Sequence, residues 1–334
     1  MDTIVSARRR ILVALAAACL IGADDARAQA WLPAAGEGSV SIVYSNSVSD
    51  RHLLPTTAYD IGRIDSHALL ADVTYGITDR VAVSIGLPLI ASRYTGNFPH
   101  QRTNPDRLDD GEFHSSWQDV RLAVRYNMVR GPLMVTPFIG SLVPSHDYEY
   151  FAHSAAGRRL NELQMGVSIG HLLQQGVPGL FVQGRYAFGI VEQTLDIRPN
   201  HSNLDFEIGY FVTSSLRVFA LGAGQLTHDG IDVFPPAISA LMLTPAQISH
   251  HDQIDRVNYL KVGAGASIDL GERFGVFGSY STQVAGRNGH ELGHSLAVGA
   301  SWSFSTRKKD QAITPDTKDD TEALARCACQ KGSL

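Results

Sequence analysis

The feature of this sequence that most restricts its fold is a two-residue alternation of apolar and polar side chains. It is clearest in Asn203–Thr213, where one face is formed by Leu204, Phe206, Ile208, Tyr210 and Val212. Gln118–Asn127 alternates in the same way and places Asp119, Arg121 and Arg125 together on its polar face. A helix would spread these charges around its circumference, whereas a strand collects them on one side. The pattern predicts strands with one apolar face.

The same pattern recurs along the chain and predicts about twelve strands. The predicted strands are Ser39–Ser45, Ala68–Tyr75, Val81–Leu89, Gln118–Asn127, Leu133–Val143, Glu162–Gly170, Leu180–Ile190, Asn203–Thr213, Leu216–Gln225, Leu260–Ile268, Phe274–Gln283 and His294–Phe304. In two of them, Leu133–Val143 and Leu216–Gln225, the sequence does not show which face is apolar.

The links between the predicted strands alternate between short and long. Short turns are predicted at Gly76–Arg80, Val129–Pro132, Leu173–Gly179, Thr213–Ser215 and Asp269–Arg273. Long links are predicted at Val48–Ile64, Ser92–Ser115, Pro144–Leu160, Gln193–Ser202, His228–Asp255 and Ala285–Gly293. Short turns on one side and long loops on the other are typical of a transmembrane β-barrel. We therefore expect an all-β fold, a transmembrane antiparallel up-and-down β-barrel.

A soluble sandwich or lipocalin-like barrel would show the same alternation, with its apolar face inside. Besides the export signal described below, two observations favour the lipid-facing barrel instead. The polar faces carry mostly small residues rather than Lys and Glu, and the loops are asymmetric in length. In lipid the barrel must close, because an open sheet edge would leave backbone groups without hydrogen-bond partners.

The two ends of the chain differ from the middle. Residues 1–28 resemble a secretory signal peptide, with Arg8–Arg10 before a short apolar stretch and an A-x-A cleavage site at Ala26–Ala28. Residues 29–305 are predicted to form the barrel, and the charged segment 306–334 a disordered periplasmic tail. This organisation predicts export through a cleaved signal peptide to the outer membrane of a Gram-negative bacterium.

Composition excludes several other classes. The formal net charge is −5 and no basic stripe is present, so nucleic acid is not an expected partner. Beyond the signal peptide the cysteines are Cys327 and Cys329, in the predicted tail, so no disulfide framework holds the fold. We expect the lipid bilayer as the surroundings of the barrel, and no cofactor.

The polar faces of the strands predict the lining of the barrel interior. The predicted lumen-lining residues are Asp72, Asp119, Arg121, Arg125, Glu162, Gln164, Gln183, Arg185, Asp205, Glu207 and Lys261. One interpretation is a paired network that holds the barrel shape or plugs it. The other is a polar constriction set by Arg121, Arg125 and Arg185, which would select weakly by charge.

An apolar run, Phe234–Leu243, lies inside a predicted long loop, where exposure to water is unfavourable. Its candidate capture residues are Phe234, Ile238, Leu241, Met242 and Leu243. One possibility is that the run folds into the barrel mouth and forms a hydrophobic uptake site or a plug. The other is that it extends a strand hairpin that packs on its neighbours.

Catalysis and metal binding have weaker support. The adjacent pairs His153-Ser154 and His294-Ser295 point to opposite faces if they lie in strands, so adjacency alone makes no nucleophile–base pair. Loop residues His250, His251 and Asp252 are metal-ligand types, as are His228 and Asp229 nearby. Solvated loop histidines are the simpler interpretation, and we predict no enzyme activity and no metal.

Two segments resemble a known family. YGITDRVAVSIGLPLI, from Tyr75 to Ile90, and WQDVRLAVRYN, from Trp117 to Asn127, resemble the outer-membrane barrel family named for the MetA pathway of phenol degradation. The last predicted strand ends in GASWSF, from Gly299 to Phe304, which is similar to the signal read by the outer-membrane assembly machinery. The family resemblance implies a transporter that admits hydrophobic or aromatic compounds, and it implies no catalytic residues.

Together these observations predict an outer-membrane barrel for passive uptake of small, hydrophobic or aromatic solutes. The alternatives are a closed structural or adhesive barrel that acts through its loops, and a lipid-modifying enzyme.

Overall fold

The computed structural model describes residues 30–100, 108–173 and 176–307. The predicted signal peptide and all but the first two residues of the predicted tail lie outside these ranges. The described strands are β1 (Glu37–Leu53), β2 (Ala58–Gly76), β3 (Val81–Thr95), β4 (His114–Trp117), β5 (Asp119–Tyr126), β6 (Leu133–Pro144), β7 (Glu162–Leu173), β8 (Leu180–Val191), β9 (His201–Phe211), β10 (Leu216–Thr227), β11 (Asn258–Leu270), β12 (Phe274–Arg287) and β13 (His290–Ser305).

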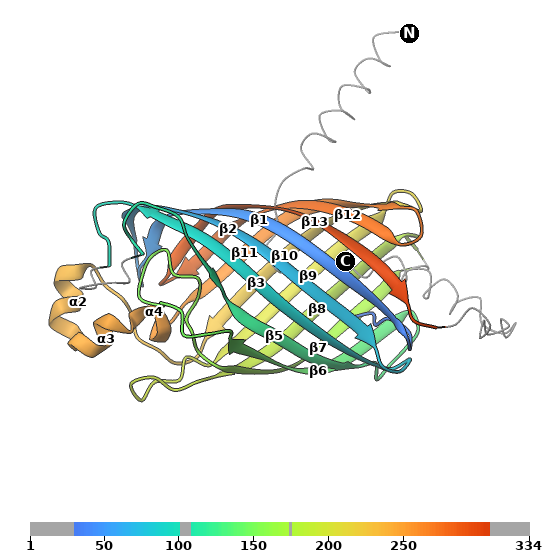
Figure 1. The fold of residues 1–334 in the computed structure, drawn as a ribbon, viewed down its shortest axis with the longest axis horizontal. Helices are drawn as coiled ribbons and strands as arrows, with labels where there is room; N and C mark the ends of the chain where they lie inside the picture. The colour runs from blue at the N-terminus through green and yellow to red at the C-terminus, as the bar shows by residue number, and fades with distance from the viewer. Residues whose placement is uncertain (1–29, 101–107, 174–175, 308–334) are drawn as a thin grey trace, which may run out of the picture.

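The strands form one closed, tilted antiparallel barrel (Figure 1). Each strand pairs with its neighbours in sequence, and β1 pairs with β13 to join the two ends of the chain. β4 and β5 both pair with β3 and are separated by Gln118 alone, so they form one interrupted strand. The barrel therefore has twelve strands, which confirms the predicted fold. Closure leaves no open edge between the first and last strands of the barrel, β1 and β13.

The facing of the strands follows the alternation. On β5 the side chains of Leu122, Val124 and Tyr126 are exposed outside the barrel, while Arg125 is buried inside. The structure also assigns the two ambiguous strands. β6 places its odd-numbered residues outward, such as Ile139, and β10 places its even-numbered residues outward.

Two predicted long loops are wrong. Val48–Ile64 and Ala285–Gly293 are mostly strand, because β1 and β2 run to a turn at residues 54–57 and β12 and β13 to one at residues 288–289. These strand ends carry polar residues on both faces, so the alternation disappears although pairing continues. Asn288 and Gly289 both have positive φ, 55° and 72°, the geometry that a two-residue Asn-Gly hairpin requires.

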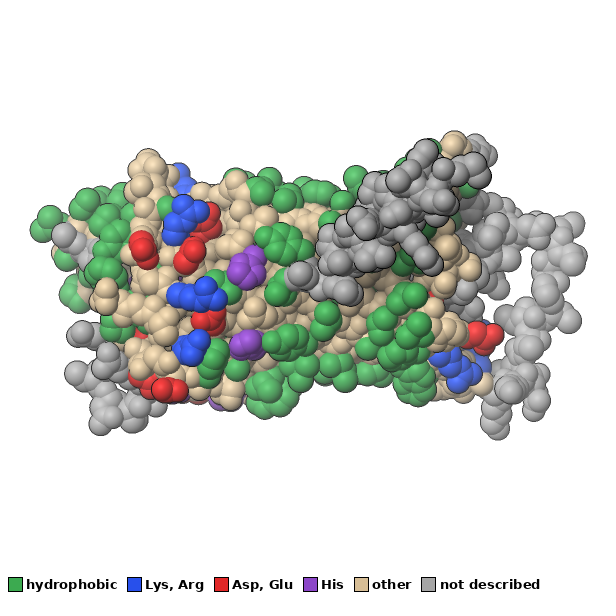
Figure 2. All heavy atoms as spheres, turned by 90° about the horizontal axis from the view of Figure 1, so that it is seen from above, with side chains coloured by type: hydrophobic (Ala, Val, Ile, Leu, Met, Phe, Trp, Pro, Cys, Tyr) green, Lys and Arg blue, Asp and Glu red, His purple; other side chains and the backbone are tan. Residues whose placement is uncertain are grey.

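The outer surface has an apolar band between two polar ends (Figure 2). Exposed aromatic side chains lie along it, towards the long loops at Tyr44 and Trp117 and towards the short turns at Tyr126 and Trp302. The Tyr44 hydroxyl lies 2.7 Å from Nδ1 of His67, so its polar tip has a partner outside the apolar band. Such amphipathic rings suit a membrane–water boundary. In the described part of the chain no helix has the length and apolar character needed to cross a membrane.

Three short helices lie at the long-loop end: α2 (Pro236–Met242), α3 (Pro245–Ser249) and α4 (His251–Ile254). They belong to the β10–β11 loop. A capping box at Thr244 and Gln247 starts α3, which separates it from α2.

Candidate functional site in the barrel interior

The barrel encloses a cavity of about 390 Å³, lined by side chains of nine strands from β2 to β11. Seven of the eleven predicted lumen residues line it: Asp72, Arg121, Arg125, Glu162, Gln164, Arg185 and Asp205. The period of two brings these side chains together, because they occupy inward positions on strands that are neighbours in the barrel.

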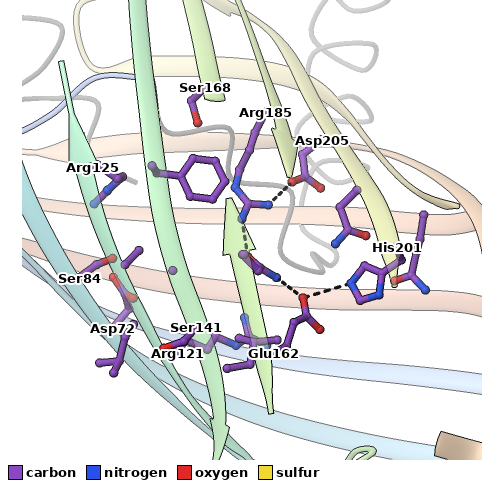
Figure 3. A pocket seen from close by; sticks show the side chains of 18 of the residues that line it. Asp72, Ser84, Arg121, Arg125, Ser141, Glu162, Ser168, Arg185, His201 and Asp205 are labelled. Atoms are coloured by element: carbon purple, nitrogen blue, oxygen red, sulfur yellow. Dashed lines mark hydrogen bonds and ion pairs between the residues drawn. The ribbon is translucent and has the colours of Figure 1, made fainter. Parts of the chain in front are cut away.

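A continuous polar ladder crosses one wall of the cavity (Figure 3). Arg185 donates to Asp205 at 3.1 Å and to Oε1 of Gln164 at 2.8 Å. The Gln164 amide donates in turn to Oε1 of Glu162 at 2.7 Å, and His201 Nε2 lies 3.1 Å from the same oxygen. Each charged group in this ladder has a partner, as burial demands. The ladder holds one side of the cavity rigid and polar.

The opposite wall carries Asp72, Arg121 and Arg125. In the strand register, Asp72 pairs with Gly86, and Gly86 pairs with Arg121 on its other side. A Cβ built on Gly86 would lie 3.0 Å from Oδ2 of Asp72, so glycine leaves room for this carboxylate. Arg125 donates to Oγ1 of Thr74 at 3.1 Å. The two walls face each other across the cavity, and both carry charge.

The other four predicted lumen residues lie towards the two ends. Asp119 accepts a hydrogen bond of 2.5 Å from the Tyr148 hydroxyl of a long loop, and Lys261 lies over the ring of Tyr259. At the short-turn end, the amide of Gln183 donates to Glu207 at 3.2 Å.

Among the described residues, the prediction missed Arg158, His201 and Arg217, which also lie in the interior. Arg158 comes from a long loop and His201 from the first residue of β9, and both line the cavity. Arg217 is buried on β10 and donates to Oγ of Ser267 at 3.0 Å. An inward Arg217 follows once the facing of β10 is known, but a loop side chain such as Arg158 has no periodic signal.

A strap formed by residues 30–35 crosses the short-turn end of the barrel. At one end the Ala30 carbonyl accepts a 2.6 Å hydrogen bond from Oγ1 of Thr136, and Trp31 packs edge-on against the buried Phe181. At the other end the Ala35 amide donates to Asp79, at the β2–β3 turn. The strap therefore runs from the β6–β8 side of the barrel to the β2–β3 side and narrows this mouth.

The long-loop end is organised around Asp109, which is buried. Its two oxygens accept hydrogen bonds of 2.9–3.1 Å from the backbone amides of His100, His153 and Ser154, and from the Ser154 hydroxyl. Burial alone would raise the pKa of this carboxyl, but the hydrogen bonds from His100 and His153 outweigh burial and hold the pKa well below its usual range. Asp109 is thus an ionised carboxylate that ties two long loops together.

Histidine rings surround this carboxylate. The rings of His251, His100, His153, His290 and His52 form a row, with successive centroids 4.1–5.2 Å apart. Burial, and then the neighbouring His100, lower the pKa of His153 to about 4, so its ring is neutral at neutral pH. The row covers part of the long-loop end.

The candidate capture residues do not fold into the mouth. Seven of the residues in Phe234–Leu243 form α2, so the run is neither a plug nor an extended hairpin. Leu241 is 88% exposed and Met242 62%, while Phe234 and Leu243 are half-buried. Ile238 is also exposed, which leaves a small apolar surface on the outer side of the loop.

The two histidine–serine pairs lack nucleophile geometry. The Ser154 hydroxyl donates to Asp109 rather than to a histidine, and Ser295 is fully buried. Neither serine has a histidine nitrogen within hydrogen-bond distance among the described residues.

No protein-family model matches the sequence, and no curated protein matches it. The resemblance to the MetA-pathway family therefore stays a prediction. Among solved structures, the fold is similar to an outer membrane channel from Pseudomonas putida F1, with a TM-score of 0.62 at 12% identity over 82% of this chain and 97% of that one.

Two other solved barrels align less well. The NanC porin gives a TM-score of 0.47 at 10% identity, over 78% of this chain and 98% of its own. The translocator domain of the autotransporter NalP from Neisseria meningitidis gives a TM-score of 0.46 at 12% identity, over 81% of this chain and 90% of its own. At this level of identity, the likeness to the Pseudomonas channel establishes the barrel fold.

Proposed function

We propose that this chain is a passive channel of a bacterial outer membrane that admits small polar solutes, with a modest preference for anions. The observation that carries the proposal is the charged cavity enclosed by the closed barrel. A purely structural barrel needs no space between its inward charges, whereas here about 390 Å³ separates them.

The exterior supports a membrane location. Outward side chains such as Ile42, Leu122 and Ile208 are apolar and exposed in the described chain, and an apolar band of this kind is costly in water. The most similar fold reported above belongs to an outer membrane channel. Closed barrels are also one of only two folds that satisfy all backbone groups in lipid.

The charge of the lining supports an anion preference. Four arginines line the cavity, Arg121, Arg125, Arg158 and Arg185, against the carboxylates of Asp72, Glu162 and Asp205. Mixed charges select only weakly by sign, so we expect a preference rather than exclusion of cations.

The test is conductance of the refolded chain from Gln29 onward in planar bilayers under a salt gradient. We expect the reversal potential of the wild type to have the sign of an anion-preferring channel. In Arg185→Gln it should shift towards cation preference, because the substitution removes one positive charge from the cavity. Arg51→Gln is the matched control, since Arg51 pairs with Glu291 on the exposed rim. A protein that migrates as a folded, heat-modifiable barrel but carries no current, and does not swell liposomes, would overturn the channel.

A second candidate, uptake of hydrophobic or aromatic solutes, is supported by the exposed apolar surface of α2. Leu241→Asp removes the most exposed apolar side chain of that surface and leaves the residues that line the cavity unchanged. If this function holds, liposome uptake of toluene-like solutes falls while the ion current stays unchanged; equal uptake by the variant would remove this candidate.

A further inference from the structure

Three metal-ligating side chains meet at the long-loop end, outside the cavity described above. His100 comes from the loop between β3 and β4, and His251 and Asp252 begin α4 in the loop between β10 and β11. Their donor atoms all lie within 4.8 Å of one another. Residues about 150 positions apart in sequence thus converge through tertiary structure alone.

The distances match a metal coordination shell. Nε2 of His100 lies 3.3 Å from Nε2 of His251, and Nε2 of His251 lies 3.3 Å from Oδ1 of Asp252. Ligands about 2.0–2.1 Å from a tetrahedral Zn²⁺ are about 3.3 Å apart. Oδ2 of Asp252 is 4.0 Å from Nε2 of His100, a distance that a small rotation of the carboxylate would shorten.

The surroundings of the two rings turn their Nε2 atoms towards each other. Nδ1 of His251 donates to the Ile248 carbonyl at 2.7 Å, so its Nε2 carries the lone pair. Nδ1 of His100 lies 3.4 Å from Oδ2 of Asp109, an acceptor that favours the proton on this nitrogen and the lone pair on Nε2. Two lone pairs that face each other at 3.3 Å repel unless a cation lies between them. Ring nitrogens backed by a carbonyl and a carboxylate are typical of metal-bound histidines.

Burial makes this arrangement costly without a cation. The side chains of His100, His251 and Asp252 are 11%, 12% and 17% exposed. Oδ2 of Asp252 is buried and accepts no hydrogen bond from the described part of the chain. A single proton between the two imidazoles would leave this oxygen without a partner, whereas a divalent ion would contact all three groups.

We propose that His100, His251 and Asp252 bind a divalent transition-metal ion, with Zn²⁺ as the reference, which holds the β3–β4 and β10–β11 loops together. Two nitrogens and one carboxylate suit Zn²⁺, Ni²⁺ or Cu²⁺ rather than Ca²⁺ or Mg²⁺. The overlapping group of His100, Asp109 and His153 is a weaker site, because both nitrogens of His153 already face partners, the Phe98 carbonyl and His290.

Metal binding would also act on transport, and this part rests on the proposed channel function. An ion that joins the two loops stabilises their arrangement beside the histidine row at the long-loop end. We therefore expect Zn²⁺ to lower the conductance of the wild-type channel.

The binding test needs no channel activity. Tag-free refolded protein is titrated with Zn²⁺ by calorimetry, and with Co²⁺, whose visible absorption distinguishes tetrahedral from octahedral sites. We expect one tight equivalent per chain and a tetrahedral Co²⁺ spectrum. His100→Ala and His251→Ala should each weaken binding by more than about 100-fold, since loss of an outer-shell partner alone costs about 10–100-fold.

The matched control is His250→Ala, because the ring of His250 faces Tyr150 and Gln253 instead of the site. Asp252→Asn keeps the shape of the side chain and covers the case in which an alanine variant fails to fold. Zn²⁺ affinity that is equal in wild type, His100→Ala and Asp252→Asn, or no tight equivalent in wild type, overturns the site. Tight binding that leaves the current unchanged overturns only the link to transport, and a silent channel that still binds Zn²⁺ contradicts the proposed function but not the site.

Discussion

At the scale of single residues, buried charge in this protein is tied to the loops as much as to the strands. Asp109 is the clearest example, because one carboxylate accepts hydrogen bonds from backbone groups of two different loops. Its neighbour Asp110 is exposed, and within the described ranges its hydrogen bonds are to local groups, the Glu112 amide and His114. Adjacent residues of the same type therefore have different roles, and only burial distinguishes them.

Asp109→Asn should open the long loops. The amide keeps the shape of the side chain but presents an NH₂ group to amide donors, and a hydrogen bond to a charged group contributes about 1.5–3 kcal/mol. A loss of about 2 kcal/mol corresponds to roughly 30-fold more of the open form. Trypsin should therefore cleave Asp109→Asn after Arg158 or Arg159 faster than it cleaves the wild type. Asp110→Asn should be cleaved at the wild-type rate. Equal rates in the two variants would show that Asp109 does not hold the loops.

At the scale of elements, the strap is the segment that crosses the short-turn end of the barrel. It is anchored by the Ala30–Thr136 hydrogen bond and by the contact of Trp31 with Phe181. A Cβ built on Gly170 would lie 2.6 Å from the Cβ of Ala30, so glycine at this position lets the strap approach β7. The strap thus depends on a small number of contacts at the barrel wall.

Trp31→Ala should loosen the strap and raise the conductance of the refolded chain that begins at Gln29. The reason is the lost edge-to-face contact, worth about 0.5–1.5 kcal/mol beyond the buried area of the ring. Single-channel recording measures the effect. Trp302→Ala is the control, because Trp302 lies on the outer surface and is half exposed. A current that is the same in Trp31→Ala and wild type would mean that the strap does not limit flow.

At the scale of the whole molecule, the barrel is longer than its apolar band. β1 and β2 continue to the turn at 54–57, and the paired ends of β12 and β13 continue beside them. These extensions carry the polar residues that gather towards the loop end in Figure 2. In the proposed membrane location, the side chains and not the ends of the strands would therefore set the position of lipid.

Ile42→Arg tests this placement. Ile42 faces outward on β1 within the apolar band, and an arginine at the bilayer midplane of a barrel costs about 2–4 kcal/mol. Its free energy of unfolding by guanidinium in lipid vesicles should fall by that amount. Thr56→Arg, in the exposed turn between β1 and β2, should change it by less than about 1 kcal/mol. An equal cost at both positions would contradict the proposed lipid band.

The sequence by itself determined the strands, their number and the facing of most of them. Facing is a local property, because successive side chains of a strand point to opposite sides, so ten or so residues such as Asn203–Thr213 suffice to show it. The inward positions of Arg185 and Asp205 follow from the same rule.

The tertiary structure decided what closes the two ends of the barrel. The contact of Ala30 with Thr136 joins residues 106 positions apart, and that of His100 with His251 joins residues 151 positions apart. Loop sequences have no periodic pattern that would predict such pairs. The long strand ends were missed for a related reason: beyond the apolar band both faces of a strand carry polar residues, so the apolar period ends before the strand does.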